Sequence, residues 1–211
     1  DPEHCLSRIF PNLSRLTLHA VPLDNYAGLR DLVERVQPQE CYHLAAVSFV
    51  SYSSDNELAT FKTNIGGTHA MLLAVREGAP GCRLFFAASS EMFGHADRSP
   101  QDENTLFRPR SVYGITKVTG FHLTRQAREQ HGLYGCSGIL YNHESERRGR
   151  EFVTRKITST VAKIKLGQAT ELRLGNLDSM RDWGYAPDYV EAMWLMLQQE
   201  QPDDYVVASG E

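Results

Sequence analysis

Residues 83–94 read RLFFAASSEMFG and residues 111–130 read SVYGITKVTGFHLTRQAREQ, and these two stretches decide the fold. The apolar run over 83–88 predicts a buried strand, and it ends on the polar residues Ser89, Ser90 and Glu91. The second stretch predicts a helix from residue 111 to about 130. A buried strand followed by a helix is the repeating unit of an α/β protein.

The same alternation extends in both directions from this unit. Upstream we expect a β-prone strand over 15–20, a helix that Pro38 ends, a strand over 41–47 and a helix over 63–76. Downstream we expect a strand over 134–141, with further helices over 154–166 and 187–199. The pattern predicts a Rossmann-like, doubly wound parallel sheet with helices on both faces. A smaller second lobe is expected to begin in the polar stretch after Asn142.

A glycine-rich turn is the element that we expect such a sheet to open with, because its backbone amides hold a pyrophosphate. The chain contains neither G-x-x-G-x-x-G nor G-x-G-x-x-G. The first recognisable strand is already followed by Asp24, at a position where such folds often contact adenine. We therefore expect the first strand, its glycine turn and its helix to be missing from this chain.

Composition favours a small-molecule enzyme. The chain has 211 residues, of which 41% are hydrophobic, enough for one sizeable core. A formal charge of −4 gives no attraction to nucleic acid. No apolar run approaches the roughly 20 residues that span a bilayer, and the first residues do not resemble a signal peptide. We expect a cytoplasmic protein with no nucleic-acid or membrane partner.

Cysteine and histidine spacing gives no support to a metal site. The four cysteines form no C-x-x-C pair and the eight histidines no H-x-x-x-H pair, so we expect no metal and free, largely buried thiols. Four histidines and four apolar residues are likewise expected to have structural roles only. His19, His69, His122 and His131 are expected to be surface or hydrogen-bonded histidines and not ligands, and core positions are expected for Met193, Trp194, Met196 and Leu197.

Three polar segments follow strands of the predicted sheet, at 44–46, 89–91 and 142–144, so they are expected to meet in one crevice. Tyr113 and Lys117 lie four residues apart and share one face of their helix. The ammonium of Lys117 is expected to lower the pKa of Tyr113, which makes the phenol a usable acid or base. This pair is weak evidence alone, but Glu91 lies 22 residues upstream of Tyr113, beside Ser89. The joint spacing favours catalysis, whereas Ser90 also suits a helix cap.

Four segments carry a specific resemblance to a known family. They are FAASSEMFG at 86–94, RPRSVYGITK at 108–117, ILYNHESERRGREFVTRKI at 139–157 and LGNLDSMRDWGYAPDYVEAMWLMLQ at 174–198. Together they resemble the GDP-mannose 4,6-dehydratases, which are extended short-chain dehydrogenases, and the likeness covers about residues 40–211. Residues 1–142 then correspond to part of an NAD(P)-binding Rossmann domain. Residues 143–211 correspond to part of a substrate-binding region with elements that return to the sheet.

The resemblance implies roles for individual residues. Four positions match the catalytic set: Ser89, Glu91, Tyr113 and Lys117. Positions that match cofactor contacts are Asp24, Leu44, Ala45, Ala46, Ser48, Tyr113, Lys117, His143 and Arg148. Positions that resemble substrate contacts are Ser90, Asn142, Lys156 and Arg181. The chain departs from the family pattern with serine at 89 for threonine, Ala45 for glycine, Glu146 for proline and Tyr185 for histidine.

The implied reaction is the dehydration of GDP-mannose through bound NADP, with a homo-oligomer expected for the full-length protein. Tyr113 would deprotonate the C4 hydroxyl during hydride transfer, and Glu91 would then remove the C5 proton before water is lost. Two alternatives stay open. One is another NAD(P)-dependent sugar-nucleotide epimerase, decarboxylase or reductase, and the other is a truncated module that only binds sugar nucleotides. The choice between NADP and NAD also stays open.

Overall fold

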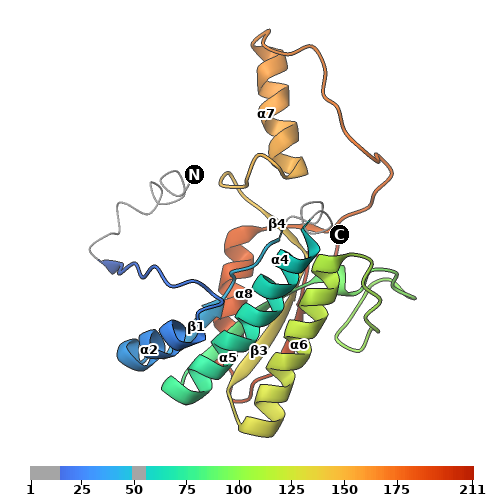
Figure 1. The fold of residues 1–211 in the computed structure, drawn as a ribbon. Helices are drawn as coiled ribbons and strands as arrows, with labels where there is room; N and C mark the ends of the chain where they lie inside the picture. The colour runs from blue at the N-terminus through green and yellow to red at the C-terminus, as the bar shows by residue number, and fades with distance from the viewer. Residues whose placement is uncertain (1–14, 49–55) are drawn as a thin grey trace.

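A four-stranded parallel sheet forms the centre of the molecule, whose computed structural model describes residues 15–48 and 56–211 (Figure 1). Its order is β1-β2-β3-β6. The strands are β1 (Glu40–His43), β2 (Arg83–Ser89), β3 (Gly135–Leu140) and β6 (Asp204–Val207). Every residue of β3 is buried, and β2 is buried between its two end residues. These strands read as unbroken apolar runs because a central parallel strand is covered on both faces.

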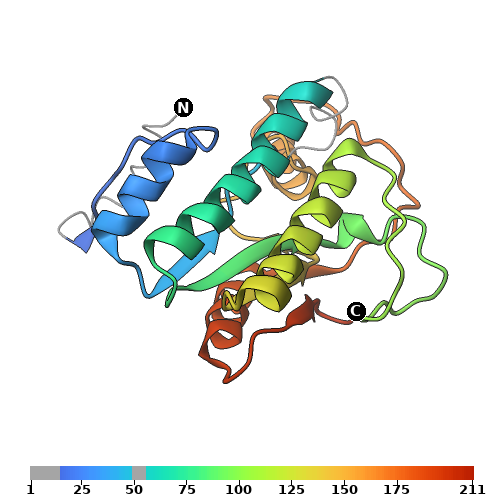
Figure 2. The same ribbon diagram turned by 60° about the horizontal axis from the view of Figure 1, so that its bottom comes forward.

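Helices cover both faces of this sheet (Figure 2). On one face lie α2 (Tyr26–Val36), α5 (Gly67–Gly78) and α6 (Val112–His131), and on the other lies α8 (Ala186–Gln198). The core accordingly has two parts. Phe86 and Ile139 face the three-helix side, whereas Phe85 and Leu140 pack with Met193 and Leu197 of α8. The predicted doubly wound fold is confirmed, and residues 1–14 and 49–55 lie outside the described part.

A second, two-stranded parallel sheet lies beyond the ends of the main strands. It pairs β4 (Asn142–Glu144) with β5 (Trp183–Tyr185). Between them the chain forms α7 (Val153–Lys165), which stands apart from the main sheet in Figure 1 and has no buried residue. Helix α8 then returns the chain to the main sheet and also contacts β4 and β5. The small sheet and the main sheet are therefore joined near the carboxyl ends of β2 and β3.

Capping residues explain where the long helices begin and end. The Ser111 hydroxyl accepts the Gly114 N–H at 3.0 Å at the start of α6. Gly132 ends that helix with a φ of 67°, a left-handed conformation that glycine adopts without strain. Asn25 caps α2 in the same way by accepting the Gly28 N–H at 3.0 Å. These local signals set the length of α6 and thereby place its first turn beside the end of β2.

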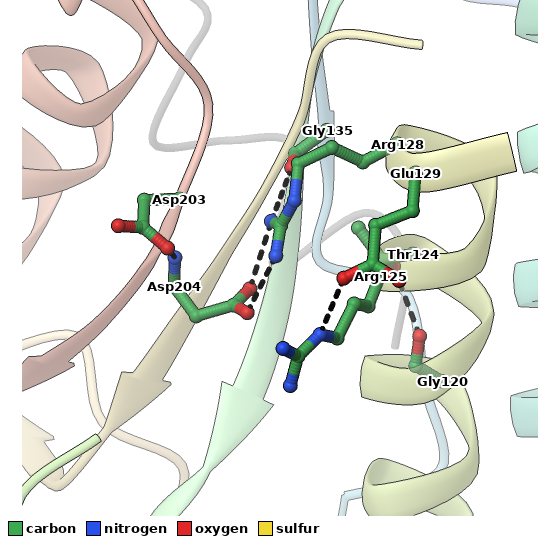
Figure 3. A network of polar contacts seen from close by, with 8 residues as sticks. All are labelled: Gly120, Thr124, Arg125, Arg128, Glu129, Gly135, Asp203 and Asp204. Carbon is green, nitrogen blue, oxygen red and sulfur yellow. Dashed lines mark hydrogen bonds and ion pairs between the residues drawn. The ribbon is translucent and has the colours of Figure 1, made fainter. Parts of the chain in front are cut away.

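An ion pair ties the last turns of α6 to the edge strand β6 (Figure 3). Arg128 Nη2 lies 2.8 Å from Asp204 Oδ2, and Arg128 Nη1 donates to the Gly135 carbonyl at 2.9 Å. Both charged side chains are nearly buried, at 13% and 10% exposure. Because the guanidinium contacts both strands at once, it fixes β3 and β6 relative to the helix that carries it.

Several predicted elements differ from the structure. No strand forms over 15–20, because a strand requires a hydrogen-bonded neighbour and no described segment offers one there. The helix expected over 63–76 starts as a π-helical turn, η2 (Lys62–Gly66), and continues as α5. A further short helix, α4 (Glu57–Phe61), precedes this turn. The short strands β4, β5 and β6 were not predicted. Trp194, expected in the core, is 50% exposed, although Met193, Met196 and Leu197 are buried.

The cysteine prediction is confirmed for the described residues, in which Cys41, Cys82 and Cys136 are free thiols. Cys5 lies outside the described residues. Of the two interpretations open for His19, His69, His122 and His131, the surface position holds, because all four are exposed. No helix in the described part of the chain is long and apolar enough to cross a membrane.

Candidate active site

Two adjoining cavities open at the carboxyl ends of β2 and β3. The first, which we call the tyrosine cavity, has a volume of about 470 Å³ and is lined by Tyr113 and Lys117. The second, the arginine cavity, has a volume of about 490 Å³ and is lined by Arg110 and Arg181. They share three lining residues, Glu91, Tyr141 and Asn142. The crevice expected beyond the strand ends therefore has two compartments that meet at a carboxylate.

The four predicted catalytic residues lie together in the tyrosine cavity. Ser89 ends β2, and its hydroxyl accepts the Glu91 N–H at 3.3 Å, which starts the short helix η3 (Ser90–Met92). Tyr113 and Lys117 come from the first two turns of α6. A side chain at Gly114 would place its Cβ 2.7 Å from the Glu91 carbonyl oxygen, so this glycine allows α6 to approach η3. Glu91 and Tyr113 reach one cavity because the two elements pack this closely.

Lys117 is held by the end of β2. Its Nζ donates to the Ala87 carbonyl at 2.6 Å and lies 5.1 Å from the centre of the Phe86 ring. Its side chain is buried, and because burial disfavours the charged ammonium, the pKa of Lys117 falls to about 8. This lysine is therefore a group that releases or takes a proton close to neutral pH.

The expectation that Lys117 lowers the pKa of Tyr113 is wrong for this arrangement. Burial raises the pKa of Tyr113 to about 12, and the Glu91 carboxylate acts in the same direction. A hydrogen bond with Ser89 is the main influence that lowers it. Lys117 Nζ lies 5.6 Å from the tyrosine ring centre and is engaged by the Ala87 carbonyl, so desolvation of the phenolate outweighs its attraction.

His143 and Arg148, the predicted contacts for a cofactor, also line the tyrosine cavity. His143 lies in β4, and its Nδ1 is 2.9 Å from the Tyr141 carbonyl. Arg148 Nε lies 3.1 Å from Glu144 Oε2, and the guanidinium carbon is 3.5 Å from the centre of the Phe152 ring. A planar cation fixed by a carboxylate and an aromatic face suits the recognition of a phosphate or a polar ring.

The loop that follows β1 forms another wall, to which Leu44, Ala46 and Ser48 contribute but Ala45 does not. Asn64, in the π-helical turn, holds this loop in place. Its side-chain oxygen accepts the Val47 N–H at 2.8 Å, and its amide nitrogen donates to the Val47 carbonyl at 3.1 Å and to Thr116 Oγ1 at 3.0 Å. Asn64 therefore connects the loop with α6.

Sequence reasoning missed Asn64, along with Gln101, Tyr141 and Arg110 of the arginine cavity. The only signal at Asn64 is a polar residue before two glycines in a helical stretch, which does not reveal a π-helical turn. The predicted substrate contacts Ser90, Asn142 and Arg181 line the arginine cavity. Lys156 lines neither cavity, because it is exposed on α7.

Asp24 lies apart from both cavities. It lines a separate hollow of about 310 Å³ with Tyr26 and His69, and its Oδ2 is 2.8 Å from Lys62 Nζ. No group of three or more potential ligands among the described residues is arranged to hold a metal ion. The chemistry available to the two main cavities is therefore proton transfer by Glu91, Tyr113 and Lys117, together with anion binding by arginines.

Comparison with known families gives a match over nearly the whole chain. Residues 3–211 match the family described as GDP-mannose 4,6 dehydratase. The GDP-mannose 4,6 dehydratase of Drosophila melanogaster is 47% identical over 199 residues, which cover 93% of this chain and 50% of that protein. GDP-mannose 4,6 dehydratase 1 of Arabidopsis thaliana is also 47% identical, over 95% of this chain and 56% of its own. The chain thus spans about half the length of the curated relatives it matches.

Solved structures support the fold. RMD from Pseudomonas aeruginosa, in a complex with NADPH, superposes with a TM-score of 0.85. The alignment covers 92% of this chain and 66% of that one, at 24% sequence identity. A similarity at this level of identity supports the arrangement of strands and helices, and any argument about chemistry must come from the residues of the site.

Proposed function

Because the chain belongs to the GDP-mannose 4,6-dehydratase family, we propose that it dehydrates GDP-mannose to GDP-4-keto-6-deoxy-mannose. The observation that carries the proposal is the meeting of Ser89, Glu91, Tyr113 and Lys117 in one cavity. These are the groups that an oxidation at C4 followed by an elimination across C5 and C6 requires. The proposal concerns the full-length protein, since the chain covers about half of its relatives.

The residues of the tyrosine cavity fit a nicotinamide cofactor, for which we propose NADP. Its walls combine apolar contacts from Leu140, Val190 and Met193 with the polar groups of His143 and Arg148. An apolar pocket with a few fixed polar groups is typical of cofactor sites. The nicotinamide would supply hydride transfer, and the protein supplies position and proton transfer. Solved structures of the same fold hold either cofactor, NADPH in RMD and NAD in the dTDP-glucose 4,6-dehydratase DesIV, so the choice of NADP rests on the resemblance to the family.

The proposed proton transfers follow from the geometry. Tyr113 would take the proton of the C4 hydroxyl while a bound nicotinamide accepts the hydride from C4. Because its raised pKa keeps the phenol protonated, Tyr113 would pass its own proton on to Lys117, and Ser89 orients the phenol through their hydrogen bond. A buried Lys117 with a pKa of about 8 receives or returns a proton near neutral pH. The resulting ketone makes the C5 proton acidic, and Glu91 removes it. The C6 hydroxyl would then leave as water with one of the two protons taken up by Tyr113 and Glu91, and C5 would regain the other as a bound nicotinamide supplies hydride to C6.

The sugar nucleotide is proposed to occupy the arginine cavity, with its reacting carbons at the shared residues Glu91 and Asn142. Ser90 and Arg181 line this cavity, and an arginine suits a diphosphate. Lys156 would contact the nucleotide only if α7 came closer to the cavity. We assign residues 1–142 to a partial cofactor domain and 143–211 to a partial substrate region. That assignment agrees with α8 and β6 returning to the main sheet.

The test is an incubation of the full-length protein with GDP-mannose and NADP. We expect a product that has lost one molecule of water and carries a keto group, with no net accumulation of NADPH. Mass spectrometry and absorbance would follow both quantities. An epimerised sugar that retains its water, or a net consumption of reduced cofactor, would instead support an epimerase or a reductase and overturn the proposal.

A further inference from the structure

The imidazole of His143 is held by a contact from a different part of the chain. Its ring stacks on the ring of Tyr189, with centroids 4.8 Å apart and an angle of 26° between the planes. Tyr189 lies in the first turn of α8 and is only 3% exposed. We propose that Tyr189 is a positioning residue, which fixes His143 in the tyrosine cavity through its ring and not through its hydroxyl. The consequence for catalysis rests on the proposed function.

Gly184 provides the space for this stack. In the ladder between β4 and β5, His143 lies opposite Gly184. A Cβ atom at position 184 would lie 2.3 Å from Cε2 of Tyr189, a distance that no packed structure tolerates. The backbone of Gly184 is not in the left-handed region, so the requirement is for space and not for a special conformation. A glycine directly across from His143 therefore admits the tyrosine ring beneath it.

A hydrogen bond restrains the imidazole ring within its own plane. His143 Nδ1 lies 2.9 Å from the Tyr141 carbonyl oxygen, which only accepts hydrogen bonds, so Nδ1 carries a proton. In the neutral ring this leaves Nε2 as an acceptor. The hydrogen bond lies in the plane of the ring and selects the tautomer, whereas the stack contacts the face of the ring and limits its tilt. Together they hold the imidazole in one orientation. The geometry points to Nε2 as an acceptor for an N–H donor, such as the carboxamide of a nicotinamide.

The hydroxyl of Tyr189 contributes nothing to this arrangement. It is buried and has no hydrogen-bond partner among the described residues. A buried hydroxyl without a partner costs free energy, so its removal is expected to be neutral or stabilising. Phenylalanine would keep the aromatic face at the same place. The positioning role can therefore be separated from any role of the hydroxyl by one conservative substitution.

The experiment compares variants of the full-length protein at neutral pH. Tyr189→Phe keeps the ring, Tyr189→Leu removes the aromatic face, and Trp194→Leu removes an exposed aromatic residue from the same helix as a matched control. Long-range ¹H–¹⁵N spectra of the histidines report the tautomer of His143 without any ligand. Fluorescence titration with NADPH gives the dissociation constant, and thermal unfolding reports stability.

We expect Tyr189→Phe and Trp194→Leu to keep the Nδ1–H tautomer and the affinity of the parent protein. Tyr189→Leu should give a mixture of tautomers and bind NADPH about two- to tenfold more weakly, the range expected for an aromatic contact. If Tyr189→Leu does not fold, Tyr189→Met keeps the volume without the ring plane and takes its place. The leucine or methionine variant with an unchanged tautomer would overturn the proposal, as would a phenylalanine variant as weak as leucine. Failure of the parent protein to bind NADPH would reject the proposed function, while the spectra would still test the positioning.

Discussion

Glu91 occupies the point where the two cavities meet, and this position separates its role from that of Tyr113. Tyr113 lines the tyrosine cavity alone, whereas Glu91 lines both. A base that must reach C5 of the sugar after C4 has been oxidised needs access from the sugar side. The geometry is therefore consistent with two successive proton transfers by two different groups, of which only the first takes part in the oxidation.

The first prediction at this scale concerns Glu91→Gln in the full-length protein. Glutamine keeps the size of the side chain but removes the base, so overall turnover should fall by about 10²- to 10⁴-fold. Oxidation at C4 should persist, and enzyme-bound NADPH should then accumulate at its own absorbance while the deoxy-sugar product is missing.

Tyr113→Phe is the matched control, because it removes the group that acts first. This variant should show neither bound NADPH nor product. Product formation by Glu91→Gln at the parent rate would mean that the carboxylate does not act at C5, and an epimerase or a reductase would then be favoured.

At the scale of elements, α6 performs two tasks at its two ends. Its first turns carry Tyr113 and Lys117 into the cavity, and its last turns carry Arg128 to the edge strand (Figure 3). The pairing with Asp204 raises the pKa of Arg128 and keeps the guanidinium charged. Since both groups are nearly buried, the loss of one partner would leave the other charge without compensation.

We therefore predict that Asp204→Asn lowers the free energy of unfolding by about 1 to 3 kcal/mol, below the cost of breaking a fully buried pair. The control is Glu129→Gln, which breaks the pair of Glu129 with Arg125 on the same helix. That pair is about half exposed, at 52% and 50%, so solvent screens it and its loss should destabilise the protein much less than the loss of the Arg128 pair. Urea unfolding of both variants measures the difference. Equal effects in the two variants would show that burial of the Arg128 pair has no special weight.

At the scale of the whole molecule, the packing of the sheet buries His43 and thereby favours its neutral form. His43 ends β1 and is 5% exposed, with its Nε2 3.0 Å from Thr68 Oγ1. Burial, together with the positive charge of Lys117, lowers the pKa of His43 from 6.5 to about 4. The unfolded chain therefore binds one more proton than the folded chain between these two pH values.

Stability should consequently fall as the pH is lowered through this window. Well above pH 6.5 the histidine is neutral in both states and contributes no pH dependence, and by pH 4 the loss approaches about 3 kcal/mol. Urea midpoints measured between pH 7 and pH 4.5 would follow this loss. His43→Gln should flatten the slope, whereas His122→Gln, at an exposed histidine, should leave it as in the parent. A slope unchanged by His43→Gln would assign the acid sensitivity to other groups.

The sequence by itself determined the central strands, the long helices and the spacing of the four proposed catalytic residues. The apolar run before Ser89 and the capped, helical stretch from residue 111 are local patterns, and local hydrogen bonding is sufficient to form them. Helical pitch alone puts Tyr113 and Lys117 on one face. The strand end at Glu91 follows from the same pattern, so local patterns place all four residues that line the tyrosine cavity at a strand end or on one helix face.

Tertiary structure alone decided how those residues are held and charged. Burial of the phenol raises the pKa of Tyr113 instead of lowering it, and the Ala87 carbonyl engages the ammonium of Lys117. Asn64 reaches Thr116 across 52 positions of sequence, and Tyr189 reaches His143 through space left by Gly184. No strand formed over 15–20 although its pattern is β-prone, because a strand depends on a neighbour. The physical reason is common to all of these cases. Burial, pairing and stacking arise between segments far apart in the chain, and the local periodicity of hydrophobic residues does not predict which segments will come into contact.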